Sequence, residues 1–167
     1  MKINGDRLVE ALSLPSHDKR VLDLLKDLGL KRPVKDENYD YVSIILTDPT
    51  GEESFEIDFD EDCKTEKQKS GAYGNIDFYL NGIAIHSNSK ITPPFEINWD
   101  DDYQNIKAKI GKRADFLNKY GHKLWLLEDS EKKYLLNVAF LENGTAKKYT
   151  LLPYNEDRTY VFTENKE

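Results

Sequence analysis

Apolar residues along this chain change their spacing from a helical period to a strand period, and the change occurs twice. The first helical set lies at positions i, i+3, i+4 and i+7 and comes directly before a glycine: Val21, Leu24, Leu25 and Leu28. Beyond Arg32-Pro33 the period becomes two, and residues 54–60 alternate between polar and apolar side chains. This order of elements predicts an α+β fold with antiparallel strands.

The first half of the chain is expected to contain two short helices and four strands. The helices are expected at residues 6–12 and directly after Ser16, which is the predicted N-cap. The four strands are expected at residues 41–47, 54–60, 76–80 and 83–86. Asp48-Pro49-Thr50-Gly51 predicts a turn between the first two strands. Asn81-Gly82 predicts a hairpin between the last two, because both residues tolerate the positive φ that a tight turn requires.

The second half repeats this order. Three carboxylates at residues 100–102 precede a short helix that is expected to end at Gly111, so they lie at the positive end of the helix dipole. Strands are expected at residues 123–127, 134–140, 146–152 and 159–162. Trp99 and Trp125 are expected in the core.

The two helix ends have similar sequences. Leu28-Gly29-Leu30-Lys31-Arg32 and Ile110-Gly111-Lys112-Arg113 lie 82 residues apart, from Gly29 to Gly111, which is close to half of 167 residues. This spacing predicts a duplication. The expected architecture is one compact domain, residues 1–167, built of two tandem units of about 1–90 and 91–167. Each unit is expected to contain a short helix-loop-helix and an antiparallel four-stranded sheet.

This layout resembles the fold of the β-lactamase inhibitory protein. Ile110-Gly111-Lys112-Arg113 is similar to the element that opens each unit of that fold and of small lipoproteins of outer-membrane assembly. The stretch from Leu24 to Pro33, followed by an aromatic strand, also resembles small bacterial proteins encoded beside toxin genes. The resemblance implies a binding protein that covers its partner with its sheet and loops. An immunity protein that neutralises a toxin domain is the most natural cytosolic member of that class.

Composition limits the possible functions. The chain has 24 Lys+Arg and 31 Asp+Glu, which gives a formal net charge of −7. A negative protein is poorly suited to bind DNA or RNA without sequence specificity, whereas it suits a basic protein partner. The longest apolar runs have about five residues, far fewer than the roughly 20 that span a membrane. The N-terminus has no apolar signal segment, and Cys63 is the single cysteine, so a cytoplasmic location is expected.

Known catalytic and metal-binding motifs are not found in the sequence. His17, His86 and His122 lack metal-ligand spacing, and no phosphate loop or nucleophile elbow occurs. The run from Asp58 to Asp62 begins like a calcium loop, but Cys63 and Lys69 replace the glycine and glutamate that such a loop needs. Neighbouring carboxylates would raise the pKa of the Cys63 thiol, which makes it a poor nucleophile. No cofactor, no metal and no enzymatic activity are therefore expected.

Two acidic clusters with nearby aromatic residues form the candidate partner-binding site. The residues are Asp58, Asp60, Glu61, Asp62, Asp100, Asp101, Asp102, Tyr73, Tyr79 and Tyr103. Carboxylates accelerate encounter with a basic partner, and tyrosines provide contact area at low entropic cost. If the two clusters share one face, the charge indicates the partner; if they do not, it indicates only solubility.

Three hypotheses follow. The first is an immunity or inhibitor protein that occludes the active site of a toxin domain, for which a basic nuclease is a natural target. The second is an adaptor or chaperone of a secreted effector, and the third is a small hydrolase that uses scattered carboxylates. The oligomeric state stays open.

Overall fold

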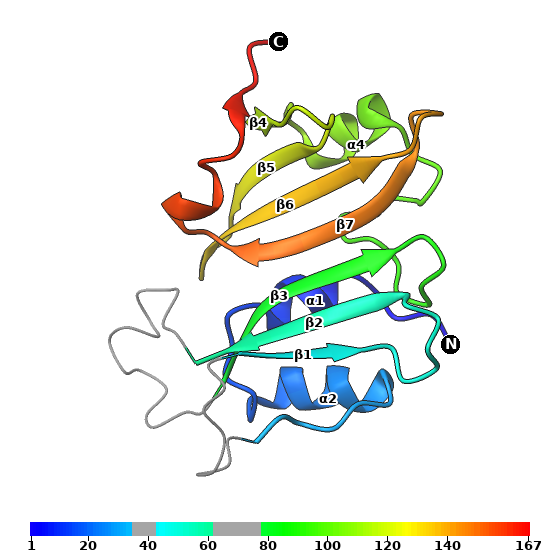
Figure 1. Cartoon of the computed structure of the whole chain (residues 1–167), viewed down its shortest axis with the longest axis vertical. Coiled ribbons are helices and arrows are strands. Elements are labelled where there is room, and N and C mark those ends of the chain that lie inside the picture. Colours follow the sequence, from blue (N-terminus) through cyan, green and yellow to red (C-terminus); the bar gives the residue numbers. More distant parts are fainter. Residues whose placement is uncertain (35–42, 62–77) are drawn as a thin grey trace.

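The computed structural model describes residues 1–34, 43–61 and 78–167, which form one large antiparallel sheet and a few short helices (Figure 1). The helices are α1 (Asp6–Ala11), α2 (Lys19–Asp27), α4 (Tyr103–Ile110) and the 3₁₀ helix η1 (Glu156–Arg158). The strands are β1 (Ser43–Thr47), β2 (Phe55–Asp60), β3 (Tyr79–His86), β4 (Phe116–Leu117), β5 (Lys123–Glu128), β6 (Lys133–Phe140), β7 (Ala146–Pro153) and β8 (Thr163–Glu164). The prediction of an α+β fold with antiparallel strands is confirmed.

The eight strands lie in the order β1-β2-β3-β7-β6-β5-β4-β8, and every neighbouring pair is antiparallel. The strands of the first half occupy one end of this sheet and those of the second half the other. β3 and β7 join the two groups, with Ile83 opposite Leu151 and His86 opposite Lys148. The halves therefore share one continuous sheet.

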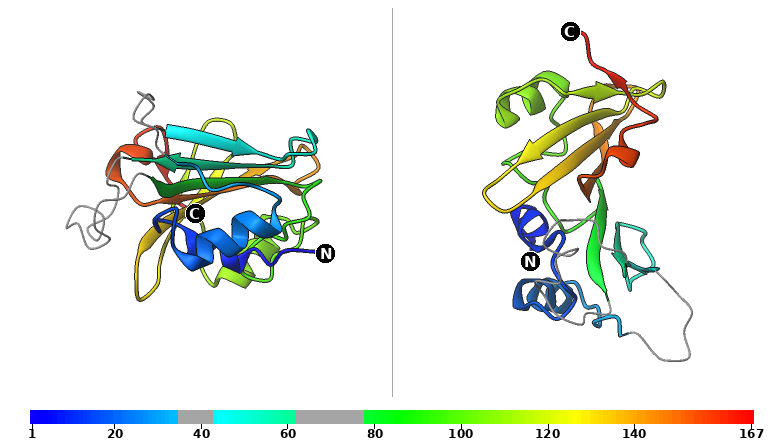
Figure 2. Two further views of the ribbon diagram at one scale, coloured as in Figure 1. Left: turned by 90° about the horizontal axis from the view of Figure 1, so that it is seen from below. Right: turned by 90° about the vertical axis from the view of Figure 1, so that its left-hand side faces the viewer.

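The α-helices cover one face of the sheet (Figure 2). In β2 the predicted alternation is confirmed, since Phe55, Ile57 and Phe59 are buried towards the helices. The same core cluster takes in Leu24 of α2 and Ile106 of α4. A single core thus lies between the helices and the sheet, along both halves.

Helix α2 forms where the helical period predicts it, but its N-cap differs from the prediction. The Asp18 side chain, not that of Ser16, accepts a hydrogen bond from the Arg20 backbone N–H. Ser16 is fully buried, and its hydroxyl accepts a hydrogen bond from Arg32 Nε at 3.0 Å. Ser16 is therefore hydrogen-bonded to the segment that follows α2, instead of capping the start of that helix. Gly29 follows α2 with φ of +74°, which agrees with the predicted helix stop.

The hairpin predicted at Asn81-Gly82 is wrong. Both residues lie inside β3, which runs without interruption through the middle of the sheet. The register of β2 and β3 shifts between Asp58 and Phe59, so the partner of Asp58 is Gly82 and the partner of Phe59 is Leu80. Asn81 is therefore the extra residue of a β-bulge. A bulge, like a tight turn, is a structure in which Asn and Gly are favourable.

The C-terminus also differs from the prediction. Residues 159–162 form a turn after η1 rather than a strand, and the final strand is β8, which pairs with the short strand β4. Residues 154–162, called the C-terminal strap below, lie on the side of the sheet opposite the helices (Figure 2). In the part of the chain that the structure describes, no helix is long and apolar enough to cross a membrane.

Candidate functional site

The side of the sheet opposite the α-helices carries the most distinctive arrangement of charged residues, and we call it the helix-free face. On β2 it presents Glu56, Asp58 and Asp60, which alternate with the buried apolar residues and form what we call the acidic row. The register places these three residues opposite Thr47, Ile45 and Ser43 of β1. The acidic row therefore lies directly beside the outermost strand of the sheet.

β1 is exposed on this face. Ser43, Ile45 and Thr47 are all exposed, and the apolar side chain of Ile45 is 62% exposed. Glu56 is exposed too, whereas Asp58, Asp60 and the following Glu61 are half-buried. An exposed isoleucine next to three carboxylates forms a surface that is apolar at the edge and negative behind it.

An arginine from the other end of the chain lies beside the acidic row. Arg158 Nη2 donates to Asn81 Oδ1 at 3.0 Å, and its Nη1 donates to the Pro153 carbonyl at 3.2 Å. Asn81 Nδ2 in turn donates to Asp58 Oδ2 at 3.1 Å. Burial lowers the pKa of Arg158, and the charges of Asp58 and Asp60 oppose this effect. The bulge in β3 is thus the place where the C-terminal strap is attached to the acidic row.

The C-terminal strap runs on the side where the second half of the sheet buries two further leucines. Leu124 and Leu135 project from β5 and β6 away from the helices, yet they are 1% and 0% exposed. Neither belongs to the core cluster under the helices. The helix-free face therefore has a buried apolar part in the second half and an exposed, charged part on β1 and β2.

The second acidic cluster lies elsewhere. Asp102 is the N-cap of α4 and accepts from the Asn105 N–H at 2.9 Å. Asp101, only 8% exposed, accepts from Lys109 Nζ at 2.6 Å, while Asp100 is exposed. Because α4 covers the opposite side of the sheet, the two clusters do not share one face. The negative charge is therefore not gathered on one face, and only the cluster on β2 stays a candidate site.

The candidate tyrosines that the structure describes are packed within the protein. Tyr79 is 4% exposed. The Tyr103 ring lies 5.8 Å from that of Trp125, and Lys123 Nζ lies 4.2 Å from its centre. Burial raises the pKa of Tyr103. These rings stabilise the fold and present little area to a partner, while Tyr73 and Asp62 lie outside the described residues.

The prediction that both tryptophans lie in the core is confirmed for Trp125, whereas Trp99 lies at the margin of the core. Trp125 is fully buried and donates from Nε1 to the Lys112 carbonyl at 3.0 Å. Trp99 is partly buried against the core, with its ring 5.0 Å from that of Tyr149 in an edge-on contact.

Two histidines lie at one end of the helix-free face. His86 of β3 is opposite Lys148 of β7, and His122 directly precedes β5. Burial lowers the pKa of both imidazoles, and the positive charge of Lys148 lowers them further. Within the described ranges no group of three His, Cys, Asp or Glu residues is arranged to hold a metal ion.

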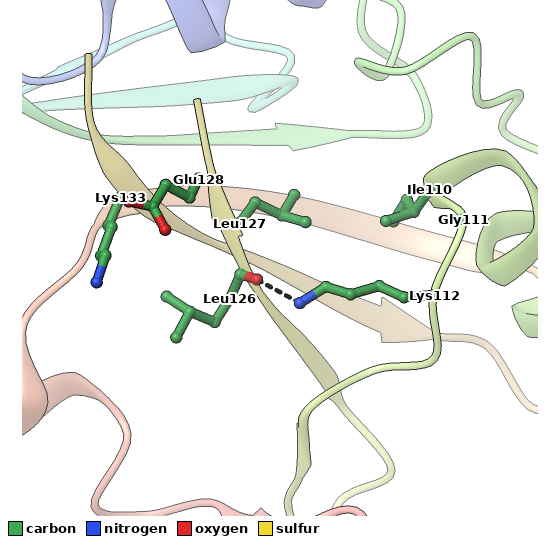
Figure 3. A pocket seen from close by; sticks show the side chains of 7 residues that line it. All are labelled: Ile110, Gly111, Lys112, Leu126, Leu127, Glu128 and Lys133. Carbon is green, nitrogen blue, oxygen red and sulfur yellow. Dashed lines mark hydrogen bonds between the residues drawn. The ribbon is translucent and has the colours of Figure 1, made fainter. Parts of the chain in front are cut away.

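A hollow of about 490 Å³ lies where α4 ends beside β5 (Figure 3). It is lined by Ile110, Gly111, Lys112, Leu126, Leu127, Glu128 and Lys133. Lys112 Nζ donates to the Leu126 carbonyl at 2.6 Å, so the ammonium group of this lysine is already hydrogen-bonded within the protein. Its lining contains one carboxylate and no histidine, and hence neither the carboxyl pair nor the His–carboxylate pair that acid–base catalysis would use.

Three residues of the helix-free face were not identified from the sequence: Ile45, Glu56 and Arg158. The alternation of residues 54–60 places Glu56 on the same face as Asp58 and Asp60, which was a usable signal. The exposure of Ile45 depends on β1 being outermost, and the position of Arg158 depends on a contact with residue 81. Neither property has a local signature in the sequence.

The chain matches no protein family model, no curated protein and no solved structure. Fold and geometry define an α+β protein with one eight-stranded antiparallel sheet, helices on one face and an acidic row on the other.

Proposed function

We propose that this protein is an immunity or inhibitor protein that binds a bacterial toxin effector domain and blocks its active site. The observation that carries the proposal is the acidic row beside the exposed strand β1. Carboxylates steer a basic partner into an encounter, and exposed apolar area next to them can be buried in the complex. A nuclease domain with a positively charged substrate channel fits such a surface. The protein would act in the cytoplasm, with no catalytic activity, no cofactor and no nucleic acid or membrane as partner.

The fold supports this proposal through its internal similarity. We infer two tandem units that resemble the β-lactamase inhibitory protein fold, one with β1–β3 and one with β4–β8. Gly29 and Gly111 both follow a helix in the left-handed conformation, with φ of +74° and +88°. Helices of both halves pack on the same face. These features favour a duplication. The described part of the first half has two α-helices and three strands, and that of the second half has one α-helix and five strands.

The direct test is co-purification with the product of the neighbouring gene, followed by an assay of that product's toxicity and catalytic activity. The expected result is a one-to-one complex in which the toxin activity is lost. Because surface charges are screened by salt, raising the salt concentration should slow association. If the pure proteins do not associate, or if deleting this protein leaves cells unharmed, the proposal is wrong.

Charge reversal tests the surface. We expect Glu56→Lys combined with Asp60→Lys to weaken inhibition about tenfold or more. Asp100→Lys is the matched control, since Asp100 is exposed near α4 on the other side of the sheet. A complex that forms while the partner stays fully active would instead indicate the adaptor or chaperone hypothesis.

A further inference from the structure

The two edges of the sheet are built differently. At one edge, β8 has two residues and pairs with β4, which also has two. Very short edge strands are one of the ways in which proteins prevent unwanted pairing. At the other edge, β1 has five residues, and among the described residues it pairs only with β2. Within residues 1–34, 43–61 and 78–167, one edge is therefore protected and the other offers a row of backbone hydrogen-bonding groups.

β1 also lacks the usual protective residues of an edge strand. Its sequence, Ser43-Ile44-Ile45-Leu46-Thr47, contains no charge and no proline. Its register with β2 is regular, without a bulge. Such an edge is prone to aggregation unless a partner covers it, so its presence points to a binding site.

The acidic row determines which chemistry fits beside β1. Strands are about 4.8 Å apart, so a strand added next to β1 would lie about 10 Å from β2. Alternate residues of the added strand would project onto the helix-free face, next to Ser43, Ile45 and Thr47. Long basic side chains at these positions can reach Glu56, Asp58 and Asp60, whereas acidic ones would be repelled.

We propose that β1 is the docking edge for an extended, basic segment of a protein partner, which adds a ninth strand to the eight-stranded sheet. Backbone hydrogen bonds to β1 provide the affinity, and alternate Lys or Arg residues that face the acidic row provide the specificity. The identity of the partner, a toxin domain, rests on the proposed function. The addition of a basic strand to β1 can be tested without the toxin.

The test uses a short synthetic peptide in which lysine alternates with valine, titrated into the full chain and followed by NMR. We expect shifts of the β1 and β2 amides, and no binding of the peptide in which glutamate replaces lysine. In an added strand only alternate N–H groups point towards β1. N-methylation of one alternate set should therefore abolish binding, and N-methylation of the other set should preserve it.

Variants of the protein locate the edge. Ile45→Lys should weaken peptide binding about tenfold or more, because it places a positive charge beside the incoming lysines. Thr47→Lys, at an already exposed and polar position, should act in the same direction if Ile45→Lys does not fold. Leu141→Lys is the matched control, since this leucine is 44% exposed at the turn between β6 and β7 and should leave binding unchanged.

Three outcomes would overturn the inference. They are absence of peptide binding, equal binding by both N-methylated peptides, and a homodimer of the free protein that Ile45→Lys dissociates. The proposed function fails separately, through a neighbouring gene product that is not inhibited. A protein that binds the peptide at β1 without inhibiting that product would keep the docking edge and lose the immunity function.

Discussion

Arg158 is the residue on which the geometry of the helix-free face depends most. Its guanidinium binds the side chain of Asn81 and the carbonyl of Pro153, and it lies close enough to Asp58 and Asp60 to feel their charges. Arginine suits this position because its planar group donates several hydrogen bonds in fixed directions. It connects residues 77 positions apart in the sequence.

Arg158→Ala should lower the free energy of unfolding by about 2–4 kcal/mol, because it leaves buried acceptors on Asn81 and Pro153 without donors. Urea denaturation followed by circular dichroism measures the effect. Arg113→Ala, at an exposed position, is the control and should change stability by less than about 0.5 kcal/mol. Equal stability of the two variants would contradict the anchoring role.

The histidines of the helix-free face should make stability depend on pH. In the folded protein the pKa of His86 and His122 lies below the ordinary value of 6.5, chiefly because of burial. The unfolded chain therefore binds protons more readily, so stability falls as the pH drops from about 7 to below 6.5. Urea midpoints at several pH values measure this slope. His86→Gln should make it shallower, and an unchanged slope would show that His86 does not contribute.

Carboxyl groups should act in a lower pH range. The pKa of Asp18, Asp23 and Asp48 is below the ordinary 3.8, in each case chiefly through a hydrogen bond from a neighbouring side chain. These three carboxylates stabilise the folded protein above pH 3.8, and this stabilisation is lost as the pH falls from 3.8 through their lower pKa in the folded protein. The histidine effect can therefore be separated from acid unfolding.

The acidic residues show what the sequence can and cannot predict about a site. Alternation along β2 was sufficient to place Asp58 and Asp60 on the face away from the core, because the period of a strand is local. The burial of Asp101 could not be predicted in this way, since it depends on Lys109 and on the backbone N–H of Asn98. Three adjacent aspartates look alike in sequence, yet one is buried, one caps a helix and one is exposed.

At the scale of elements, the strand β3 explains the largest error of prediction. The helices, β2 and the strands β5, β6 and β7 follow from hydrophobic periodicity, which is a local property, whereas the two-residue strands β4 and β8 are too short to show any period. Asn81-Gly82 is compatible with either a turn or a bulge, and the choice depends on β7, which is distant in sequence. With Leu151 opposite Ile83, the strand continues through the bulge instead of turning.

The N-terminal segment is held against the connection between the two halves. Ile3 forms a parallel bridge with Ile91, and the Gly5 N–H donates to Thr92 Oγ1 at 3.2 Å. A Cβ on Gly5 would lie 2.1 Å from the Thr92 carbonyl oxygen, so the two backbone segments could not keep this distance. The glycine is required by close packing and not by its φ of −64°.

Gly5→Ala should therefore destabilise the protein by about 2–4 kcal/mol. Gly51→Ala is an informative comparison, because Gly51 has φ of +79° but no atom within 4 Å of its would-be Cβ. That variant should cost only about 1 kcal/mol, the strain of a left-handed alanine. Thermal or urea unfolding distinguishes the two, and an equal loss would contradict the close-packing explanation.

At the scale of the whole molecule, the two halves depend on each other. β3 and β7 pair along the middle of the sheet (Figure 1), and one core cluster extends from Leu8 of α1 to Trp125 of β5. Lys132, in the turn between β5 and β6, donates to the Glu10 and Leu12 carbonyls at the end of α1. The two halves of the chain therefore share one sheet and one core.

Unfolding should therefore be a single cooperative transition. Tryptophan fluorescence reports on the second half, through Trp99 and Trp125, and amide exchange of Phe55–Asp60 reports on the first. The two probes should give the same urea midpoint. If the β2 amides lost their protection from exchange at a lower urea concentration than the fluorescence midpoint, the halves would unfold independently.

The difference between the two edges of the sheet has a consequence for polymerisation. A filament grows through a sheet only if each subunit presents two open edges, one for the subunit before it and one for the subunit after it. This chain presents a five-residue edge at β1, while β8 at the other end has two residues. A subunit of this kind can end a growing stack of strands but cannot extend it, so it would act as a chain terminator.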